Sequence, residues 1–510
     1  MTTFQALIAA HGATQPRSIA FHIEAESIDW QTLHEHTTRA AGALIRMGIA
    51  PGDRVALLGG ASAAYLEGLF GTIAARGCVV PLPVSASTET LQALLADCAA
   101  KVLFVDADVG EAIGPIAQQQ GVQVIGLHGD AFAAWRDSAD PATPLPVGQA
   151  EDAFNIIYSS GTTGLPKGIV HLHDMRQRQA TRKGFFSPQA RTLLSTPMYS
   201  NTTLMPMLGT LANGGTCILM RKFDAGGFLQ LVARHRVTHT MLVPVQYRRI
   251  LAHPDFDRSD LSSLELSQTT GAPMDAALKR EILDRWPGRL LEVYGLTEGG
   301  VSFFLDARAH PDKLATVGKA GHGTEAFLID EAGQRIPPDQ VGATGEVVGR
   351  SPFMMAGYHN RPEATAEIRW VDEQGTVYHR SGDIGRFDAD GFLTLLDRAK
   401  DVIISGGHNI HAADLEAVLL RHEAVADAAV IGVPSPQWGE TPLALVVPKP
   451  GMSIDAAALR EWVNAQVGKT QRLSAVELRE ELPRSALGKL SKKELRAPWW
   501  DAARKAKEPA

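Results

Sequence analysis

Residues 158–168 read YSSGTTGLPKG and directly follow the largely apolar run AFNII at 153–157. Three glycines and four serine or threonine hydroxyls lie within this stretch, so its backbone N–H groups and side chains offer the donors that phosphate oxygens require. Lys167 adds a positive charge. The stretch is not a Walker A loop, because Pro166 stands where that motif needs a glycine before the lysine. The sequence therefore predicts a phosphate-binding loop after a β-strand.

On both sides of this loop, short apolar runs alternate with amphipathic helical stretches. This alternation predicts parallel sheets with helical crossovers, in two wound α/β subdomains. From about Gly318 shorter β-like runs predict a small β-rich subdomain, and after Arg398 helices return. We expect an α/β fold with a large N-terminal domain at 1–397 and a smaller, mobile α+β domain at 398–510. The expected strands of the two wound subdomains are 53–60, 78–83, 101–107, 153–160, 192–198, 216–220, 239–244, 264–270 and 290–295.

Composition excludes several classes of protein. The 49 Lys and Arg residues against 56 Asp and Glu residues give a net charge of -7, which argues against nucleic acid as a partner. No uninterrupted apolar run reaches the roughly 18 residues of a membrane span, so no integral membrane segment is expected. The three cysteines have no metal-site or disulfide spacing, and the N-terminal residues lack the pattern of an export signal. A cytoplasmic location is therefore expected.

Further motifs follow the glycine-rich loop in a fixed order. They are GAP at 271–273, YGLTE at 294–298, GEV at 345–347, RSGD at 380–383, DRAKD at 397–401, ISGG at 404–407 and PRSALGK at 483–489. Together with the loop, they resemble the adenylate-forming superfamily of acyl-CoA synthetases, peptide-synthetase adenylation domains and beetle luciferases. The run at 401–419, DVIISGGHNIHAADLEAVL, is similar to the chlorobenzoate- and coumarate-CoA ligase branch.

The resemblance implies a site for ATP. Lys167 and Thr297 contact phosphates, Glu298 holds Mg²⁺, and Lys489 bridges the acyl carboxylate and the α-phosphate during adenylation. Asp383 accepts hydrogen bonds from the ribose hydroxyls, with Arg398 close by. The other nucleotide-binding residues that the resemblance implies are Ser159, Ser160, Gly161, Thr162, Thr163 and Gly164 for phosphate, and Gly271, Ala272, Pro273, Tyr294 and Gly295 for adenine.

The same resemblance implies a second step, in which a thiol attacks the acyl-adenylate. The C-terminal domain is expected to rotate about a hinge at Lys400, which withdraws Lys489 from the site. Rotation brings up Gly406 and Gly407, whose lack of a side chain leaves a narrow path for pantetheine. Trp438 is a candidate contact for the nucleotide end of CoA, and Arg472 is a weaker one.

The acyl pocket is inferred from the neighbours of the motifs. Ser200 occupies a position where many relatives carry histidine, which leaves the acyl specificity open. No fixed cation for a second carboxylate is evident in the set, so a hydrophobic monocarboxylic acid, fatty or aromatic, is expected. The pair Gly299 and Gly300 suggests room for an aromatic or a medium-to-long acyl group. The predicted pocket residues are Tyr199, Ser200, Asn201, Gln246, Tyr247, Thr270, Val293, Gly300 and Val301.

The histidine pairs His171/His173 and His408/His411 have ligand-like spacing but no third ligand nearby, so they are interpreted as surface or loop histidines. The preferred hypothesis is an AMP-forming acid–thiol ligase that uses ATP, Mg²⁺ and CoA. Two alternatives stay open, namely transfer of the acyl group to a carrier protein and a noncatalytic nucleotide-binding module. The sequence also leaves a homodimer open.

Overall fold

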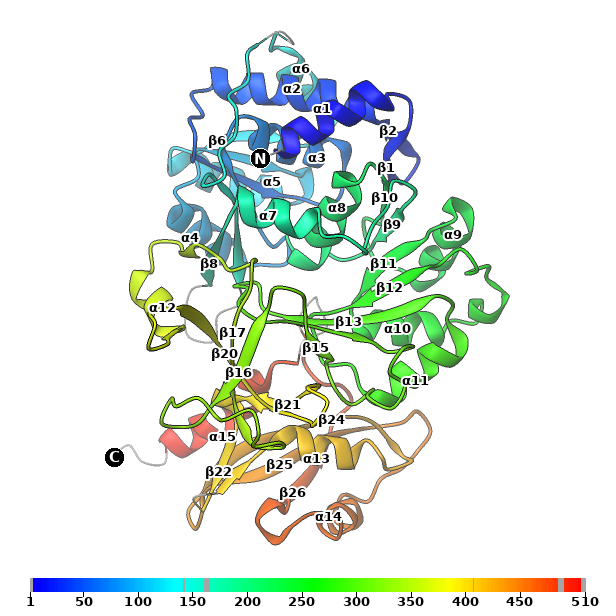
Figure 1. Cartoon of the computed structure of the whole chain (residues 1–510), viewed down its shortest axis with the longest axis vertical. Helices are drawn as coiled ribbons and strands as arrows, with labels where there is room; N and C mark the ends of the chain where they lie inside the picture. The colour runs from blue at the N-terminus through cyan, green and yellow to red at the C-terminus, as the bar shows by residue number, and fades with distance from the viewer. Residues whose placement is uncertain (1–2, 141–142, 160–165, 407, 485–489, 506–510) are drawn as a thin grey trace. The chain divides into compact units, whose positions relative to one another are not determined.

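The computed structural model describes residues 3–140, 143–159, 166–406, 408–484 and 490–505 (Figure 1). The chain forms two compact units. The first unit comprises Met1–Leu314, Gly321–Glu325 and Arg350–His379, and the second comprises Ala315–Ala320, Ala326–Gly349 and Arg380–Ala510. Both units mix helices with sheets, which confirms the predicted α/β class.

One sheet of the first unit has the strand order β18-β8-β7-β4-β3-β5-β6. Strands β7, β4, β3, β5 and β6 are parallel, whereas β8 runs antiparallel to β7 and β18 runs antiparallel to β8. The alternating runs predict β3, β4, β5 and β7 and their parallel arrangement, whereas β6 was not predicted. The strands are β3 (Arg54–Leu58), β4 (Cys78–Pro81), β5 (Val102–Val105), β6 (Gln123–Gly126), β7 (Ala153–Ser159), β8 (Lys167–Leu172) and β18 (Gly357–Tyr358).

The other sheet of the first unit has the order β14-β13-β12-β11-β9-β10-β1-β2. The hairpin β1–β2, near the start of the chain, joins this sheet through a parallel pairing of β1 with β10, which sequence periodicity did not predict. The strands are β1 (Ile19–Ile23), β2 (Glu26–Asp29), β9 (Arg191–Leu194), β10 (Thr216–Leu219), β11 (His239–Leu242), β12 (Leu266–Thr269), β13 (Arg289–Gly295) and β14 (Ser302–Asp306).

Helices connect the parallel strands of both sheets, and one hydrophobic core contains residues from both sheets and from α1, α2, α3 and α8. Trp30, Tyr65 and Phe104 are among its fully buried side chains. The helices of the first unit are α1 (Phe4–Thr14), α2 (Trp30–Arg46), α3 (Ala63–Ala74), α4 (Thr88–Cys98), α5 (Ala107–Gln119), α6 (Gly129–Asp137), α7 (His173–Ala180), α8 (Asn201–Ala212), α9 (Ala225–His235), α10 (Pro244–Leu251), α11 (Ala276–Arg285) and α12 (Pro362–Glu367).

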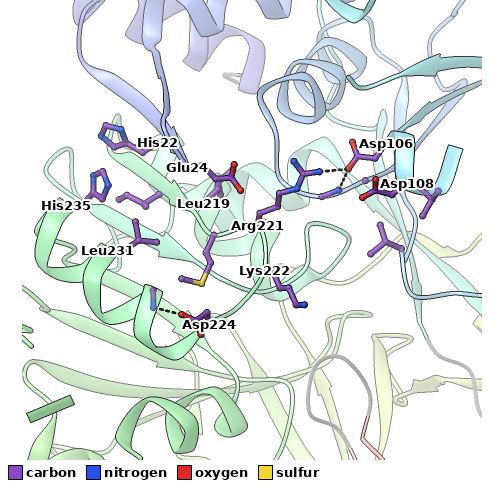
Figure 2. A pocket seen from close by; sticks show the side chains of 17 residues that line it. His22, Glu24, Asp106, Asp108, Leu219, Arg221, Lys222, Asp224, Leu231 and His235 are labelled. Carbon is purple, nitrogen blue, oxygen red and sulfur yellow. Dashed lines mark hydrogen bonds and ion pairs between the residues drawn. The ribbon is translucent and has the colours of Figure 1, made fainter. Parts of the chain in front are cut away.

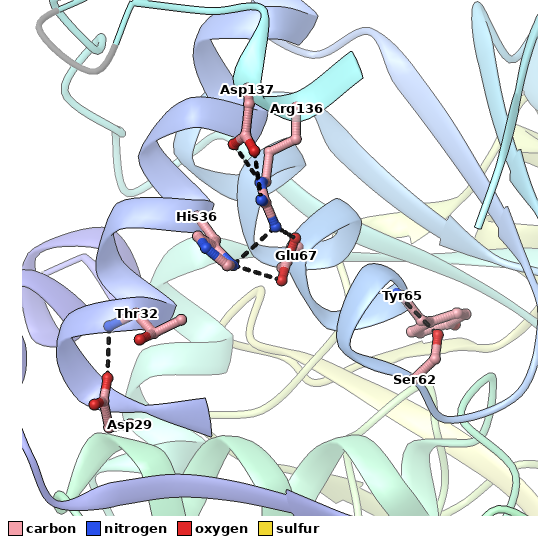
Figure 3. Close-up of polar contacts among 8 residues, drawn as sticks. All are labelled: Asp29, Thr32, His36, Ser62, Tyr65, Glu67, Arg136 and Asp137. Carbon is pink, nitrogen blue, oxygen red and sulfur yellow. Dashed lines mark hydrogen bonds and ion pairs between the residues drawn. The ribbon is translucent and has the colours of Figure 1, made fainter. Parts of the chain in front are cut away.

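A partly buried polar cluster ties α2, α3 and α6 together (Figure 3). The Arg136 guanidinium donates to Glu67 at 2.8 Å and to Asp137 at 2.8 Å, and His36 Nδ1 lies 2.8 Å from Glu67. Because Glu67 is only 3% exposed, its charge needs these partners. The same view shows Ser62 Oγ accepting from the Tyr65 N–H, which caps the N-terminus of α3.

The second unit carries two sheets. In the first, β21 pairs with β20 beside β17 and β16; in the second the order is β23-β22-β25-β24, with β26 on β25. The helices α13 and α14 return as the sequence predicts, whereas α15 was not predicted. The elements are β16 (Glu325–Ile329), β17 (Thr344–Arg350), β20 (Val377–Phe387), β21 (Leu393–Arg398), β22 (Ile403–Ser405), β23 (His408–Ile410), α13 (Ala412–Leu419), β24 (Val425–Ser435), β25 (Gly439–Pro448), α14 (Ala456–Asn464), β26 (Ala475–Leu478) and α15 (Lys492–Lys505).

Within the ranges that the structure describes, no helix has the length and apolar character needed to cross a membrane.

Candidate active site

The predicted phosphate-binding loop joins β7 to β8 in the first unit. Ser159 and Lys167 are paired across these antiparallel strands, so the two ends of the loop lie side by side. The Lys167 ammonium lies 5.0 Å from the centre of the Tyr358 ring, within the range of a cation–π contact. Five residues of the predicted site in this loop lie outside the described residues, namely Ser160, Gly161, Thr162, Thr163 and Gly164.

Tyr358 also contacts Glu298, the carboxylate predicted to hold magnesium. Its hydroxyl donates to Glu298 Oε1 at 2.8 Å. The residue reaches this place because β18 pairs with β8, directly after the phosphate-binding loop. One tyrosine therefore touches both Lys167 and Glu298, which come from separate motifs. Tyr358 belongs to none of the predicted motifs, and only the long-range pairing of β18 with β8 brings it to the site.

The backbone of the YGLTE loop is held by the segment before β18. The Met355 N–H donates to the Glu298 carbonyl at 2.9 Å. Gly299 has a left-handed φ of 73°, and a Cβ there would lie 2.1 Å from the Phe353 carbonyl oxygen. Backbone conformation and this close approach therefore explain the glycine, without any need to invoke room for an acyl chain.

The residues predicted for adenine lie at neighbouring strand ends. Gly271 to Pro273 follow β12, and Tyr294 and Gly295 end β13, which is parallel to β12. The carboxyl ends of parallel strands meet at one edge of the sheet, where ligands bind in open α/β folds. Gly271 has a φ of 89°, a conformation that favours glycine. The fold thus brings the two predicted adenine walls to one edge.

The predicted acyl-pocket residues are distributed over several elements, and some serve the fold itself. Ser200 caps the N-terminus of α8, and Asn201 Oδ1 accepts from Arg176 at 2.7 Å. Gln246 donates to the Ser195 carbonyl at 3.2 Å. Tyr247 is fully buried and donates to the Gln268 carbonyl at 2.9 Å. The remaining residues of the set are Tyr199, which precedes α8, Thr270 after β12, Val293 in β13, and Gly300 and Val301 before β14.

The interpretation of His171 and His173 as surface histidines is wrong. His171 lies in β8 and His173 begins α7, and both side chains are buried. Burial lowers the pKa of His173 to about 4, and the His173 ring packs against Phe154 with the centres 5.0 Å apart. Burial and the neighbouring Arg176 charge hold the pKa of His171 well below its ordinary value. His171 Nε2 lies 2.7 Å from the carbonyl oxygen of Thr297, in the YGLTE loop.

In the second unit, the two residues predicted near the ribose are paired with each other. Asp383 in β20 lies opposite Arg398 in β21, and Arg398 Nε lies 2.7 Å from Asp383 Oδ1. Lys400, the predicted hinge, follows in the 3₁₀ turn Ala399–Asp401. Its carbonyl accepts from Arg496 of α15 at 3.3 Å.

The predicted contacts for the thiol substrate also meet in the second unit. The Gly406 N–H donates to the Trp438 carbonyl at 2.8 Å, and a Cβ on Gly406 would lie 2.8 Å from the Trp438 ring. The Trp438 side chain is 52% exposed, so it offers an aromatic surface. Gly407 and Lys489, which belong to the predicted thiol path and adenylation site, lie outside the described residues.

Metal-binding capacity centres on Glu298. The described part of the chain holds no cluster of three or more His, Cys, Asp or Glu side chains arranged for a metal ion. The partly exposed Glu298 carboxylate can supply one hard oxygen ligand, as Mg²⁺ prefers. A magnesium ion here fits only as part of a magnesium–nucleotide complex, whose phosphates supply further oxygen ligands.

A separate cavity of about 680 Å³ lies in the first unit at the carboxyl ends of β3, β5 and β10 (Figure 2). Gly59, Gly60, Asp106, Arg221 and Lys222 are among the residues that line it. Asp106 accepts from the Gly60 N–H at 2.8 Å and pairs with Arg221 at 3.3 Å. The side chains of Glu24, Asp106, Asp108 and Asp224 also line the cavity. Carboxylates therefore lie beside the two cations, and the cavity is not a simple anion site. Of the motif residues that the structure describes, none lines this cavity.

Comparisons with known proteins agree with these features. Residues 8–359 match the AMP-binding enzyme family, and residues 414–489 match the AMP-binding enzyme C-terminal domain. The chain is 36% identical to feruloyl-CoA synthase of Amycolatopsis sp, over 94% of this chain and 96% of that protein. It is 32% identical to the fatty acid–[acyl-carrier-protein] ligase ScoC of Streptomyces coeruleorubidus, over 97% and 96%.

Among solved structures, ATP-bound MatB from Rhodopseudomonas palustris superimposes with a TM-score of 0.88. It shares 29% sequence identity and covers 98% of this chain and 99% of its own. The two family matches, the shared fold and the grouped motif residues lead to one conclusion: the chain belongs to the AMP-binding enzyme family of adenylate-forming enzymes.

Proposed function

We propose that the protein is an AMP-forming acid–thiol ligase, which activates a hydrophobic monocarboxylic acid with ATP and transfers it to CoA. The observation that carries this proposal is the contact of Tyr358 with both Lys167 and Glu298. Through Tyr358, the Lys167 ammonium and the Glu298 carboxylate lie on either part of one side chain. Glu298 follows β13, whose end carries part of the predicted adenine site. A phosphate-bearing nucleotide fits this arrangement, and the relatives that share these motifs include CoA ligases.

The residues divide the adenylation step between them. The acid's carboxylate oxygen attacks the α-phosphorus of ATP, and pyrophosphate leaves with the electron pair of the bond that breaks. Lys167 would neutralise phosphate oxygens and Thr297 would donate a hydrogen bond to them, and Glu298 would hold the magnesium of the nucleotide. Asp383 accepts from the ribose hydroxyls, while Lys489 bridges the acyl carboxylate and the α-phosphate. The thiol of CoA then attacks the acyl carbon, and AMP leaves.

The domain assignment is part of this proposal. An adenylation domain at 1–397 and a C-terminal domain at 398–510 exchange two arrangements about Lys400. One arrangement serves adenylation with Lys489, and the other serves thioester formation with Gly406, Gly407 and Trp438. The ring of Trp438 against Gly406 supports a shared role for these two residues.

The acid substrate is proposed from the similarity to feruloyl-CoA synthase and to 4-coumarate–CoA ligases. These names make hydroxycinnamic acids the first candidates, with straight-chain fatty acids second because fatty-acid ligases are also similar. A magnesium–ATP substrate and a cytoplasmic location complete the proposal.

A second candidate function differs in the acceptor. The similarity to an enzyme named for an acyl-carrier-protein acceptor favours transfer to the phosphopantetheine thiol of a carrier protein. A noncatalytic nucleotide-binding module is disfavoured, because Lys167, Glu298, Asp383, Arg398 and Lys489 are all retained.

Purified protein tests the proposal when AMP release is measured with ATP, Mg²⁺ and a panel of acids. The panel contains ferulic and 4-coumaric acids, benzoates, straight-chain fatty acids, amino acids and dicarboxylates, each with CoA or with a loaded carrier protein. We expect CoA-dependent AMP release with a hydrophobic monocarboxylic acid. Activity confined to amino acids or dicarboxylates would contradict the proposed acid class, and activity confined to the carrier protein would select the second candidate.

Tyr358→Phe should reduce the rate of acyl-adenylate formation about tenfold, because Glu298 loses the hydrogen bond that fixes its carboxylate. The ring that lies against Lys167 remains. The rate is measured as acid-dependent exchange of labelled pyrophosphate into ATP. Tyr358→Leu removes ring and hydroxyl together and should lower the rate further. A Tyr358→Phe enzyme with the wild-type rate would show that this hydroxyl has no part in orienting Glu298.

Gly406→Ala should slow thioester formation about tenfold and leave adenylation unchanged. The new Cβ would lie 2.8 Å from the Trp438 ring and would displace it from the proposed thiol path. Synthetic acyl-adenylate plus CoA measures the thioester step alone. Gly451→Ala is the matched control, since Gly451 has a φ of 78° with open space around it. Equal effects of the two substitutions would attribute the loss to backbone strain rather than to Trp438.

A further inference from the structure

Beneath the YGLTE loop, the first unit buries a polar network that the proposed chemistry does not use. Asn155 in β7, His171 in β8 and Arg176 in α7 are each completely inaccessible to solvent. Arg176 donates to Asn155 Oδ1 at 2.9 Å, to Asn201 Oδ1 at 2.7 Å and to Gln179 Oε1 at 2.8 Å. The network therefore links the two strands that flank the phosphate-binding loop to the N-terminus of α8.

The hydrogen bonds determine which nitrogen of His171 carries the proton. The Arg176 guanidinium lies 3.0 Å from His171 Nδ1, and the Asn155 amide nitrogen lies 3.2 Å from the same atom. Both neighbours are donors, because Asn155 Oδ1 already faces Arg176. Nδ1 must then be an acceptor, and the single proton of the neutral ring lies on Nε2. This N–H donates to the Thr297 carbonyl at 2.7 Å.

The charge of Arg176 is costly in this position. All four of its acceptors are uncharged, and within the described ranges the guanidinium has no ion pair with a carboxylate. Burial lowers the pKa of Arg176 to about 9, so the group stays protonated at neutral pH. A core built only for stability gains nothing from a cation without a counter-ion, since apolar side chains fill such space at lower cost.

We infer that His171 and Arg176 are positioning residues for adenylation, which hold the Thr297 carbonyl and so fix the Thr297–Glu298 segment for the magnesium–nucleotide. Arg176 donates to His171 Nδ1 and so keeps the proton of the ring on Nε2. The Nε2–H group then donates to the Thr297 carbonyl and fixes the position of the loop. Met355 and Tyr358 hold Glu298 from other directions. The inference rests on the proposed roles of Thr297 and Glu298.

The test compares His171→Leu, which removes the donor, with His171→Gln, whose amide can donate to Thr297 and accept from Arg176. Hydrogen exchange of the peptide spanning 289–301, measured by mass spectrometry, reports the loop without requiring any activity. Calorimetric binding of magnesium–ATP in the absence of acid reports the site. We expect His171→Leu to speed exchange of this peptide several-fold and to weaken magnesium–ATP binding about tenfold. His171→Gln should restore both to within about threefold.

His173→Leu is the matched control, because it removes a buried imidazole that packs on Phe154 and whose Nε2 has no hydrogen-bond partner among the described residues. It should leave exchange of the 289–301 peptide unchanged. If His171→Leu does not fold, the double variant His171→Leu/Arg176→Met removes the buried charge together with the donor and should show the same two effects. Wild-type exchange and wild-type magnesium–ATP binding in a folded variant lacking His171 would overturn the inference. If His171→Leu speeds exchange of the peptide but the wild-type protein binds no magnesium–ATP, the result would instead contradict the proposed function.

Discussion

Lys489→Ala should lower the rate of acyl-adenylate formation by on the order of 10³-fold. The substitution removes the cation that is proposed to bridge the acyl carboxylate and the α-phosphate, where negative charge develops as pyrophosphate leaves. Thioester formation from synthetic acyl-adenylate and CoA should keep its wild-type rate, because Lys489 is proposed to be withdrawn for that step. Pyrophosphate exchange and thioester production measure the two halves separately.

Lys493→Ala is the control for this substitution, since Lys493 is an exposed lysine of the same C-terminal stretch. It should leave both half-reactions close to wild type. Equal losses in both half-reactions of Lys489→Ala would contradict the exchange of two domain arrangements about Lys400. Such a result would assign Lys489 to the folding of the C-terminal domain instead.

Glu298→Gln should reduce adenylation by on the order of 10²-fold, because the amide keeps the shape of the side chain but removes the charge that binds magnesium. The magnesium concentration needed for half-maximal pyrophosphate exchange should rise as well. The hydrogen bond from Tyr358 can be kept, since Gln also offers an acceptor at this position.

Glu373→Gln provides the comparison, as Glu373 is an exposed glutamate of the same unit. It should change neither the rate nor the magnesium dependence. A Glu298→Gln enzyme with a lower rate but an unchanged magnesium dependence would remove Glu298 from metal binding and leave it only an electrostatic or structural role.

Local sequence patterns predicted much of the fold because each strand and helix of a wound α/β domain has its own period and its own boundaries. The strands β3, β4, β5 and β9 to β13 follow apolar runs that end at glycine, proline or polar residues. Two pairings had no such local signal. The hairpin β1–β2 joins β10, and β18 joins β8, and both depend on contacts between residues that are distant in the chain.

The same limit applies to the site. Motifs indicated Lys167, Glu298, Asp383 and Arg398, and the fold pairs the last two across β20 and β21. Tyr358 carried no recognisable chemical signal, because its role comes only from the β18–β8 pairing. His171 was misjudged because spacing alone cannot distinguish an exposed histidine from one buried against an arginine. Its position in an apolar strand, IVHL, was the available sign of burial.

The protein is proposed to form an acyl-adenylate and then to pass the acyl group to CoA. The most direct measurement follows the release of pyrophosphate and AMP by the wild-type protein with ATP, Mg²⁺ and the best acid of the panel, first without CoA and then after CoA is added. We predict pyrophosphate release of about one equivalent per active site without CoA, followed by continuous AMP and acyl-CoA production once CoA is present. Continuous AMP release at the same rate with and without CoA, or no acid-dependent pyrophosphate at all, would contradict the claim.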